Sequence, residues 1–145
     1  MHAAWALTHC CDRKIKSVEP CHSYFVSIVW QMNNESAKRT VIRTLSLLPL
    51  IDEMDGDFFD KTLQNIISKS TPIANKAFSI DILMKYVALY PELASEIDES
   101  LNLAILDASP GVLNKIKKTK KGEKVMVRDD DCRRRNNRDQ ARACR

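Results

Sequence analysis

Glycine is scarce in this 145-residue chain, which contains three glycines, all outside the long stretches of periodic apolar residues. No stretch alternates apolar and polar residues over a useful length, so the sequence carries no strand signal. No apolar run approaches the roughly 20 residues of a transmembrane helix. These absences predict a helical protein and exclude a membrane-spanning one.

A secretory signal and a disulfide framework are also missing. The first residues, "MHAAWALTHCCDRK", place no basic segment before their short apolar part. The five cysteines are odd in number and form no even pattern. Cysteines without an even pattern are typical of proteins in a reducing compartment, and we therefore expect a cytoplasmic protein.

Excess charge of one sign is confined to the end of the chain. Residues 1–121 contain 15 Lys and Arg against 14 Asp and Glu, which leaves 8 against 5 for residues 122–145 from totals of 23 and 19. A nearly neutral body argues against a dedicated nucleic-acid-binding domain, which is usually basic.

What the sequence does contain is apolar residues at helical spacing. The pattern predicts helices over about 2–11, 19–32, 36–51, 57–67, 72–89, 91–105 and 110–121. The helix over 72–89 is apolar nearly all round, which predicts neighbours on several sides and makes this helix the expected stability centre, with Phe78 in its core. The helix over 19–32 should bury Cys21, and the helix over 57–67 should bury Phe59 and Ile67.

Prolines and small polar residues mark the expected helix ends. Pro20, Pro72, Pro91 and Pro110 fall at helix starts, where the missing N–H costs nothing, and Pro49 should kink or end the third helix. Small polar residues before two of these prolines are candidate caps, namely Thr71 and Ser109. Within 72–89, Asp81 and Lys85 have the spacing of a favourable pair on one helix.

A repeat of about 36 residues organises these helices. The pairs Ala4-Trp5, Val41-Ile42 and Ala77-Phe78 align at offsets of 37 and then 36, and so do Cys10-Cys11, Leu47-Leu48 and Leu83-Met84. A helix pair that repeats about three times is typical of an α-solenoid, because each unit leaves an apolar face for its neighbour to cover.

Three stretches carry a family resemblance: "HAAWALTHCCDRKIKSVEPCHSYFVSIV", "SAKRTVIRTLSLLPLI" and "TPIANKAFSIDILMKYVALYPEL". They resemble the HEAT-repeat family of armadillo-like α–α superhelices, in particular small HEAT-like bacterial proteins, over about residues 2–121. The resemblance implies an all-α superhelix of about three helix pairs that acts as a scaffold or interaction module. It implies no catalytic residue.

The pattern ends after Lys121. Residues 122–145 are strongly charged, and their main apolar residues are Val125, Met126 and Val127. Such a segment buries too little surface to order itself. We expect a domain over 1–121 and a disordered tail over 122–145, although a shifted reading frame or an extraneous terminus would also give this abrupt change.

Several residue clusters suggest chemistry without completing a site. His9, Cys10, Cys11, Cys21 and His22 are soft metal ligands, but their spacing is not that of a zinc knuckle, and core packing explains the cysteines better. The acidic turn at 52–60 lacks the calcium-loop pattern. Trp5 and Trp30 could stack on bases or pack in the core. We therefore predict no catalytic residue, no cofactor and no metal, and expect a protein that is not an enzyme.

Basic residues are the remaining candidates for binding. Arg39 and Arg43 lie one turn apart, opposite an apolar stripe, and should project from the stack as two guanidinium forks or as plain surface charges. The last helix ends in a cluster of lysines, namely Lys115, Lys117, Lys118, Lys120 and Lys121. The cluster either complements the helix dipole or contacts phosphate.

Two kinds of partner follow. The first is a protein, bound by a helical surface. The alternative is a nucleic acid, bound as in the alkylation-repair branch of HEAT-like folds. Trp5 lies almost at the first residue, with no capping helix before it. The first two helices could therefore also associate with another copy of the chain through an uncovered face.

Overall fold

In the computed structural model, residues 2–13, 15–50 and 55–121 are described, and their regular structure is entirely helical. Seven α-helices occur in these ranges: α1 (His2–Arg13), α2 (His22–Ile28), α3 (Glu35–Leu47), α4 (Gly56–Ile67), α5 (Ile73–Leu89), α6 (Ala94–Ile105) and α7 (Pro110–Lys120). Short 3₁₀ helices extend them: η1 (Ile15–Cys21), η2 (Val29–Gln31) and η3 (Pro91–Leu93). The expected all-α class is confirmed, whereas the expected disorder of residues 122–145 lies outside the described residues.

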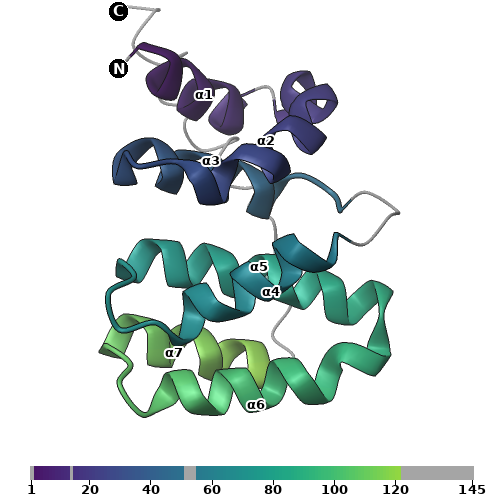
Figure 1. The fold of residues 1–145 in the computed structure, drawn as a ribbon, viewed down its shortest axis with the longest axis vertical. Helices are drawn as coiled ribbons and strands as arrows, with labels where there is room; N and C mark the ends of the chain where they lie inside the picture. Colours follow the sequence, from purple (N-terminus) through teal and green to yellow (C-terminus); the bar gives the residue numbers. More distant parts are fainter. Residues whose placement is uncertain (1, 14, 51–54, 122–145) are drawn as a thin grey trace, which may run out of the picture.

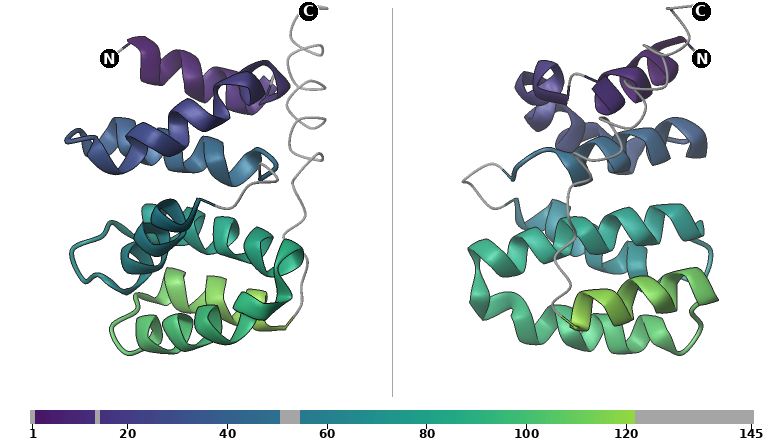
Figure 2. Two further views of the ribbon diagram at one scale, coloured as in Figure 1. Left: turned by 45° about the vertical axis from the view of Figure 1, so that its right-hand side comes forward. Right: turned by 180° about the vertical axis from the view of Figure 1, so that it is seen from behind.

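The helices stack in two layers (Figure 1). In the first layer α1 packs on α3, α3 on α5 and α5 on α7, while α4 and α6 pack on each other in the second layer. Seen from behind in Figure 2, α7 lies beside α5. This is the expected α-solenoid, and α7 adds a fourth member to the first layer.

The repeat pairs recognised in the sequence lie in or directly after successive helices of the first layer, α1, α3 and α5. At the offsets of 37 and 36, Cys11 aligns with Leu48 and Met84; Cys11 and Leu48 are buried, whereas Met84 is only partly buried. Leu83 is fully buried, but it aligns with Leu47, which is only partly buried. The repeat is therefore a repeat of helix order, and the depth of equivalent positions differs between units.

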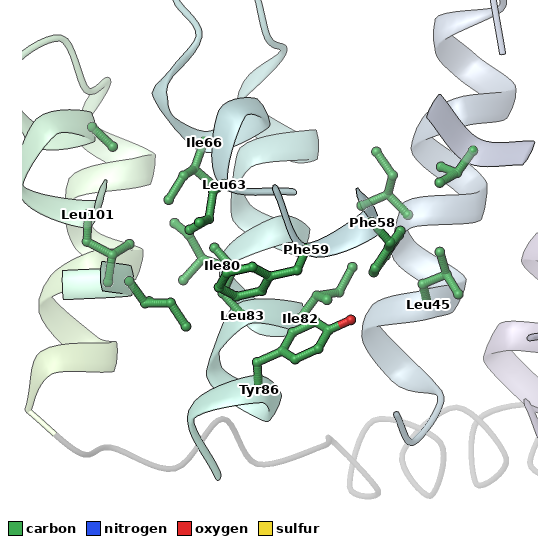
Figure 3. Close-up of a cluster of buried hydrophobic side chains, with 14 of the residues drawn as sticks. Leu45, Phe58, Phe59, Leu63, Ile66, Ile80, Ile82, Leu83, Tyr86 and Leu101 are labelled. Atoms are coloured by element: carbon green, nitrogen blue, oxygen red, sulfur yellow. The ribbon is translucent and has the colours of Figure 1, made fainter. Parts of the chain in front are cut away.

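The core runs from η2 to α7 and is densest around α5. Ile80, Ile82 and Leu83 are almost fully buried, and Figure 3 shows them between side chains of α3, α4 and α6. Phe59 meets Tyr86 edge to face, with ring centroids 5.2 Å apart. The prediction that this helix has neighbours on several sides is thus confirmed, but Phe78 itself is only partly buried against the core.

Two expected core positions are wrong. Cys21 is exposed and His22 is buried instead, because the segment around Pro20 forms the 3₁₀ helix η1, whose tighter winding turns Cys21 off the apolar stripe. In α4, Ile67 is 39% exposed and Phe58 is buried. Phe58 packs against Trp30 with ring centroids 6.1 Å apart, so the buried face of α4 also reaches η2.

The helix ends agree only in part with the expectations. Leu48 is the C-cap of α3, directly before Pro49, and Pro110 is the first residue of α7. Thr71 is not a cap, because Pro72 takes that position and the Thr71 hydroxyl donates to Asn65 Oδ1 at 3.2 Å. Ser109 occupies the N-cap of α7 but makes no side-chain cap hydrogen bond.

Candidate functional site

Only one residue of the expected arginine pair is available at the surface. Arg39 is exposed on α3. Arg43 is partly buried, and its guanidinium bonds Asp12 Oδ1 of α1 at 2.5 Å. The expectation that both forks project from the stack is therefore wrong for Arg43, which ties two first-layer helices together.

Two of the five expected lysines are also engaged within the domain. Lys115 Nζ lies 2.5 Å from Asp81 Oδ1 of α5. Lys120 Nζ lies 2.8 Å from Asp98 Oδ1 and donates to Asn102 Oδ1 at 2.7 Å, both on α6. The hydrogen bond from Lys120 lowers the pKa of Asp98 below its usual range. Both lysines therefore stabilise the contacts of α7 with its neighbours.

The remaining candidates do not form one patch. Lys117, Lys118 and Lys121 are exposed near the end of α7. Arg39 lies on α3, and α5 separates the two helices. Two interhelical spacings amount to roughly 16–20 Å. The structure thus divides the expected basic surface into an isolated arginine and a lysine cluster, which we call the α7 lysine cluster (Lys117, Lys118 and Lys121).

Charge is nevertheless segregated between the two layers. Helices α3, α5 and α7 contain nine Lys and Arg against two acidic residues, whereas α4, η3 and α6 contain six acidic residues against one lysine. Six of those nine basic side chains are among the residues that the sequence predicted for binding. Helix α1 adds one residue of each sign, Arg13 and Asp12, so the first layer is basic and the second acidic. The nearly neutral total of residues 1–121 conceals this arrangement.

The sequence did not reveal that Lys85 connects two helices of the first layer. Its ammonium donates to Leu48 O at 2.5 Å and to Leu45 O at 3.2 Å. These carbonyls lie at the C-terminus of α3, where a cation is favourable. The expected pair of Lys85 with Asp81 is wrong, because Asp81 bonds Lys115 and Lys85 reaches α3. Burial lowers the pKa of Lys85 to about 8, against the opposing effect of Asp81.

His22 is the second buried titratable group in this part of the stack. Burial lowers its pKa, and the charge of Lys85 acts in the same direction. No partner of its Nδ1 atom is found among the described residues. Burial and the charge of Lys85 therefore both disfavour the protonated imidazole.

The soft-ligand cluster of the N-terminal region is dispersed. Cys11 is buried and shares a hydrogen bond of 3.0 Å with the Thr44 hydroxyl, and burial raises the pKa of its thiol. Cys21 faces solvent. Across the described ranges, no three His, Cys, Asp or Glu side chains lie close enough to hold a metal ion.

Trp30 packs as a structural residue. Its ring is partly buried against the core, with Phe58 on one side and Lys38 Nζ 5.9 Å from the ring centroid. Covered in this way, its ring offers little surface for stacking on a base. The side chain of Trp5 lies outside the described part.

One apolar groove of about 380 Å³ opens where α5, α6 and α7 meet. Its walls are mainly aliphatic, and a few polar groups lie among them. The lining residues are Met84, Val87, Ala94, Ile97, Asp98, Leu101, Thr119 and Lys120. The charged members, Asp98 and Lys120, already neutralise each other. The groove therefore suits an apolar side chain better than a charged ligand.

Stacked helices that share one core define an α-solenoid. The chain belongs to the HEAT repeat domain family, whose model matches residues 1–123. Comparison with curated proteins and with solved structures gave no match. None of the described helices is both long and apolar enough to cross a membrane.

Proposed function

We propose that this HEAT repeat domain is a non-enzymatic interaction module that binds an acidic surface of another protein. The observation that carries the proposal is the charge segregation between layers, with Arg39 and the α7 lysine cluster as its exposed candidates. Family membership supports a scaffold, since HEAT repeats present extended surfaces built from stacked helices. Electrostatic complementarity of this kind speeds association and selects partners.

A nucleic acid is the second candidate partner, and the ion pairs weigh against it. Arg43, Lys115 and Lys120 are each paired with a carboxylate. A protein that binds a duplex can neutralise about 6–10 phosphates. Of the candidate cations here, four remain unpaired with a carboxylate of the described residues: Arg39 on α3 and the three lysines of the α7 lysine cluster. Four cations divided between two helices fit contact with a protein better than contact with a continuous phosphate backbone.

The setting and extent of the module are part of the proposal. Unbridged Cys10, Cys11 and Cys21 support action in the cytoplasm. We propose a functional domain over residues 1–121, with 122–145 outside it. We also propose a second surface, on α1 and α2, for self-association.

Capture from native cells with and without nuclease tests the proposal. The protein partner should remain bound after nuclease treatment. Reversing charge in the α7 lysine cluster (K117E, K118E and K121E together) should weaken binding of that partner about tenfold. The matched control is Lys61→Glu on α4, in the acidic layer, which should leave binding unchanged.

The nucleic-acid alternative makes an opposite set of predictions. Nuclease should then abolish capture, and the purified chain should bind a labelled mixed-sequence duplex. That affinity should fall steeply as salt rises, with a slope set by the number of neutralised phosphates. This combination would overturn the protein-binding proposal.

A further inference from the structure

The groove between α5, α6 and α7 exists because α7 is short. Helix α5 has 17 residues, and α7 has 11. The two run side by side: a Cβ placed on Gly111 would lie 3.7 Å from Ile73 Cγ2, and Lys115 pairs with Asp81. These two contacts place Lys120, the last residue of α7, level with α5 residues between Ile82 and Tyr86.

Helix α5 continues past that level to Leu89, three to seven residues further, or about 4.5–10.5 Å at 1.5 Å per residue. Seen from behind in Figure 2, α7 stops before the end of α5. Met84 and Val87 of α5 and Ile97 and Leu101 of α6 therefore line a space that a longer α7 would fill.

The chain itself leaves α7 at the edge of this space. Thr119 and Lys120 line the groove, and Lys121 is the C-cap of α7. The next apolar residues are Val125, Met126 and Val127, four to six positions beyond Lys121. A chain covers at most about 3.3–3.6 Å per residue, so these side chains are within roughly 13–22 Å of the groove edge.

The chemistry of the triplet matches the groove walls. The walls are mainly aliphatic, and their charged rim is satisfied by the Lys120–Asp98–Asn102 contacts. The triplet is the main apolar feature of residues 122–145, where charged residues prevail. Attachment only a few residues away gives it a high effective concentration, which a separate peptide lacks.

We propose that the segment Val125–Val127 of this chain docks in the groove beside the end of α7. The segment covers Met84 and Val87, which are only partly buried, in place of the missing turns of α7. Ile97 and Leu101 are already buried at the base of the groove. This inference concerns a different surface from the α7 lysine cluster and does not depend on the partner proposed above.

Methionine methyl groups provide a direct test with the full chain. The chain has five methionines, of which Met84 lines the groove and Met126 lies within the segment. With ¹³C-labelled methionine methyls, we expect a nuclear Overhauser contact between Met126 and Met84. Replacing Val125, Met126 and Val127 by serine should shift the Met84 signal and leave that of Met32 unchanged, since Met32 packs elsewhere on the core.

The opposing outcomes are equally specific. A missing contact, together with an unshifted Met84 signal in the serine variant, would overturn the proposal. A contact that appears only between differently labelled copies, and grows with concentration, would identify a second copy as the occupant. A circular-dichroism spectrum of the serine variant with unchanged helix content shows that the domain is still folded, so that the shifted signal reports on docking.

Discussion

Lys85 shows what burial does to a charged side chain in this stack. The side chain leaves α5, passes into the core and caps the C-terminus of α3 through two carbonyls. Capping favours the ammonium, but burial opposes it and prevails, since the pKa falls to about 8 from 10.5. Lys85 therefore links α5 to α3, and the free-energy cost of keeping its buried ammonium charged depends on pH.

That cost predicts a pH-dependent stability. In the pH window between about 8 and 10.5 the unfolded chain keeps a proton on Lys85 that the folded chain has lost, so the free energy of unfolding rises with pH. Denaturant unfolding of the wild type and of Lys85→Met should be compared between pH 7 and 9.5. We expect the wild type to gain about 1–3 kcal/mol relative to the variant across this range.

The comparison isolates Lys85, because both chains retain the other perturbed groups. Tyr86, whose pKa burial raises to about 12, and Cys11 change stability equally in both. A constant difference across the pH range would show that the pKa of Lys85 is not lowered. His22 gives a second readout: its pKa should rise in the variant, because the charge of Lys85 lowers it.

The centre of α5 should carry the largest packing energies. Leu83 is fully buried, so Leu83→Ala should lower the free energy of unfolding by about 2–5 kcal/mol through lost burial and a residual cavity. Leu89→Ala on the same helix is the control, since Leu89 is 53% exposed. Phe78→Ala should fall between the two. Equal effects of Leu83 and Leu89 in chemical denaturation would contradict the assigned core.

At the scale of the helix, local hydrogen bonds decide where several elements begin. The Asn34 side chain accepts from Ala37 N at 2.9 Å at the start of α3. Asp55 accepts from Phe58 N at 3.0 Å at the start of α4. Ser109, in the same position before α7, has a buried hydroxyl with no partner among the described residues. Asn34 and Asp55 thus each satisfy a backbone amide at a helix start, whereas Ser109 in the equivalent position does not.

These caps give a matched pair of predictions. Asp55→Ala should cost about 1 kcal/mol of stability, because it leaves the Phe58 amide without its acceptor. Ser109→Ala removes an oxygen that satisfies no cap and should be neutral or slightly stabilising. Thermal unfolding of both variants checks the contrast. A larger loss for the serine variant would show that its hydroxyl has a partner after all.

Helix positions were predictable because their causes lie close together in the sequence. Apolar spacing located all seven α-helices, and Pro49 and Pro110 marked ends that the structure confirms. The errors arose where the cause lies elsewhere in the chain. The η1 segment turned Cys21 outward, and contact with Trp30 brought Phe58 into the core.

The candidate surface was harder to predict for the same reason. Sequence spacing identified basic residues but not their partners, which lie on other helices. Arg43 and Asp12 are 31 residues apart, and Lys85 and Leu48 are 37 apart. Once stacking brings these helices together, charges that seemed free at the sequence level become part of the scaffold.

At the scale of the whole molecule, the stack is unevenly supported. The buried core cluster extends from Val29 to Ile116, and α5 touches α3, α4 and α7. Helix α1 rests mainly on α3 and contributes Leu7 and Cys11 to the packed interior. Since solenoid stability is approximately a sum of nearest-neighbour terms, α1 should open at a lower free energy than α5.

Native-state hydrogen exchange tests this gradient, and Arg43 allows it to be perturbed. We expect α5 amides to exchange only at a free energy near that of global unfolding, and α1 amides to exchange earlier. Arg43→Ala removes the bond to Asp12 and should lower protection of α1 by about 0.5–1 kcal/mol while leaving α5 unchanged. Lys61→Ala is the control, because its 2.7 Å pair with Asp57 lies within α4 and joins no two helices. Equal loss of protection in α1 and α5 would mean that the two-layer stack unfolds as a single cooperative unit.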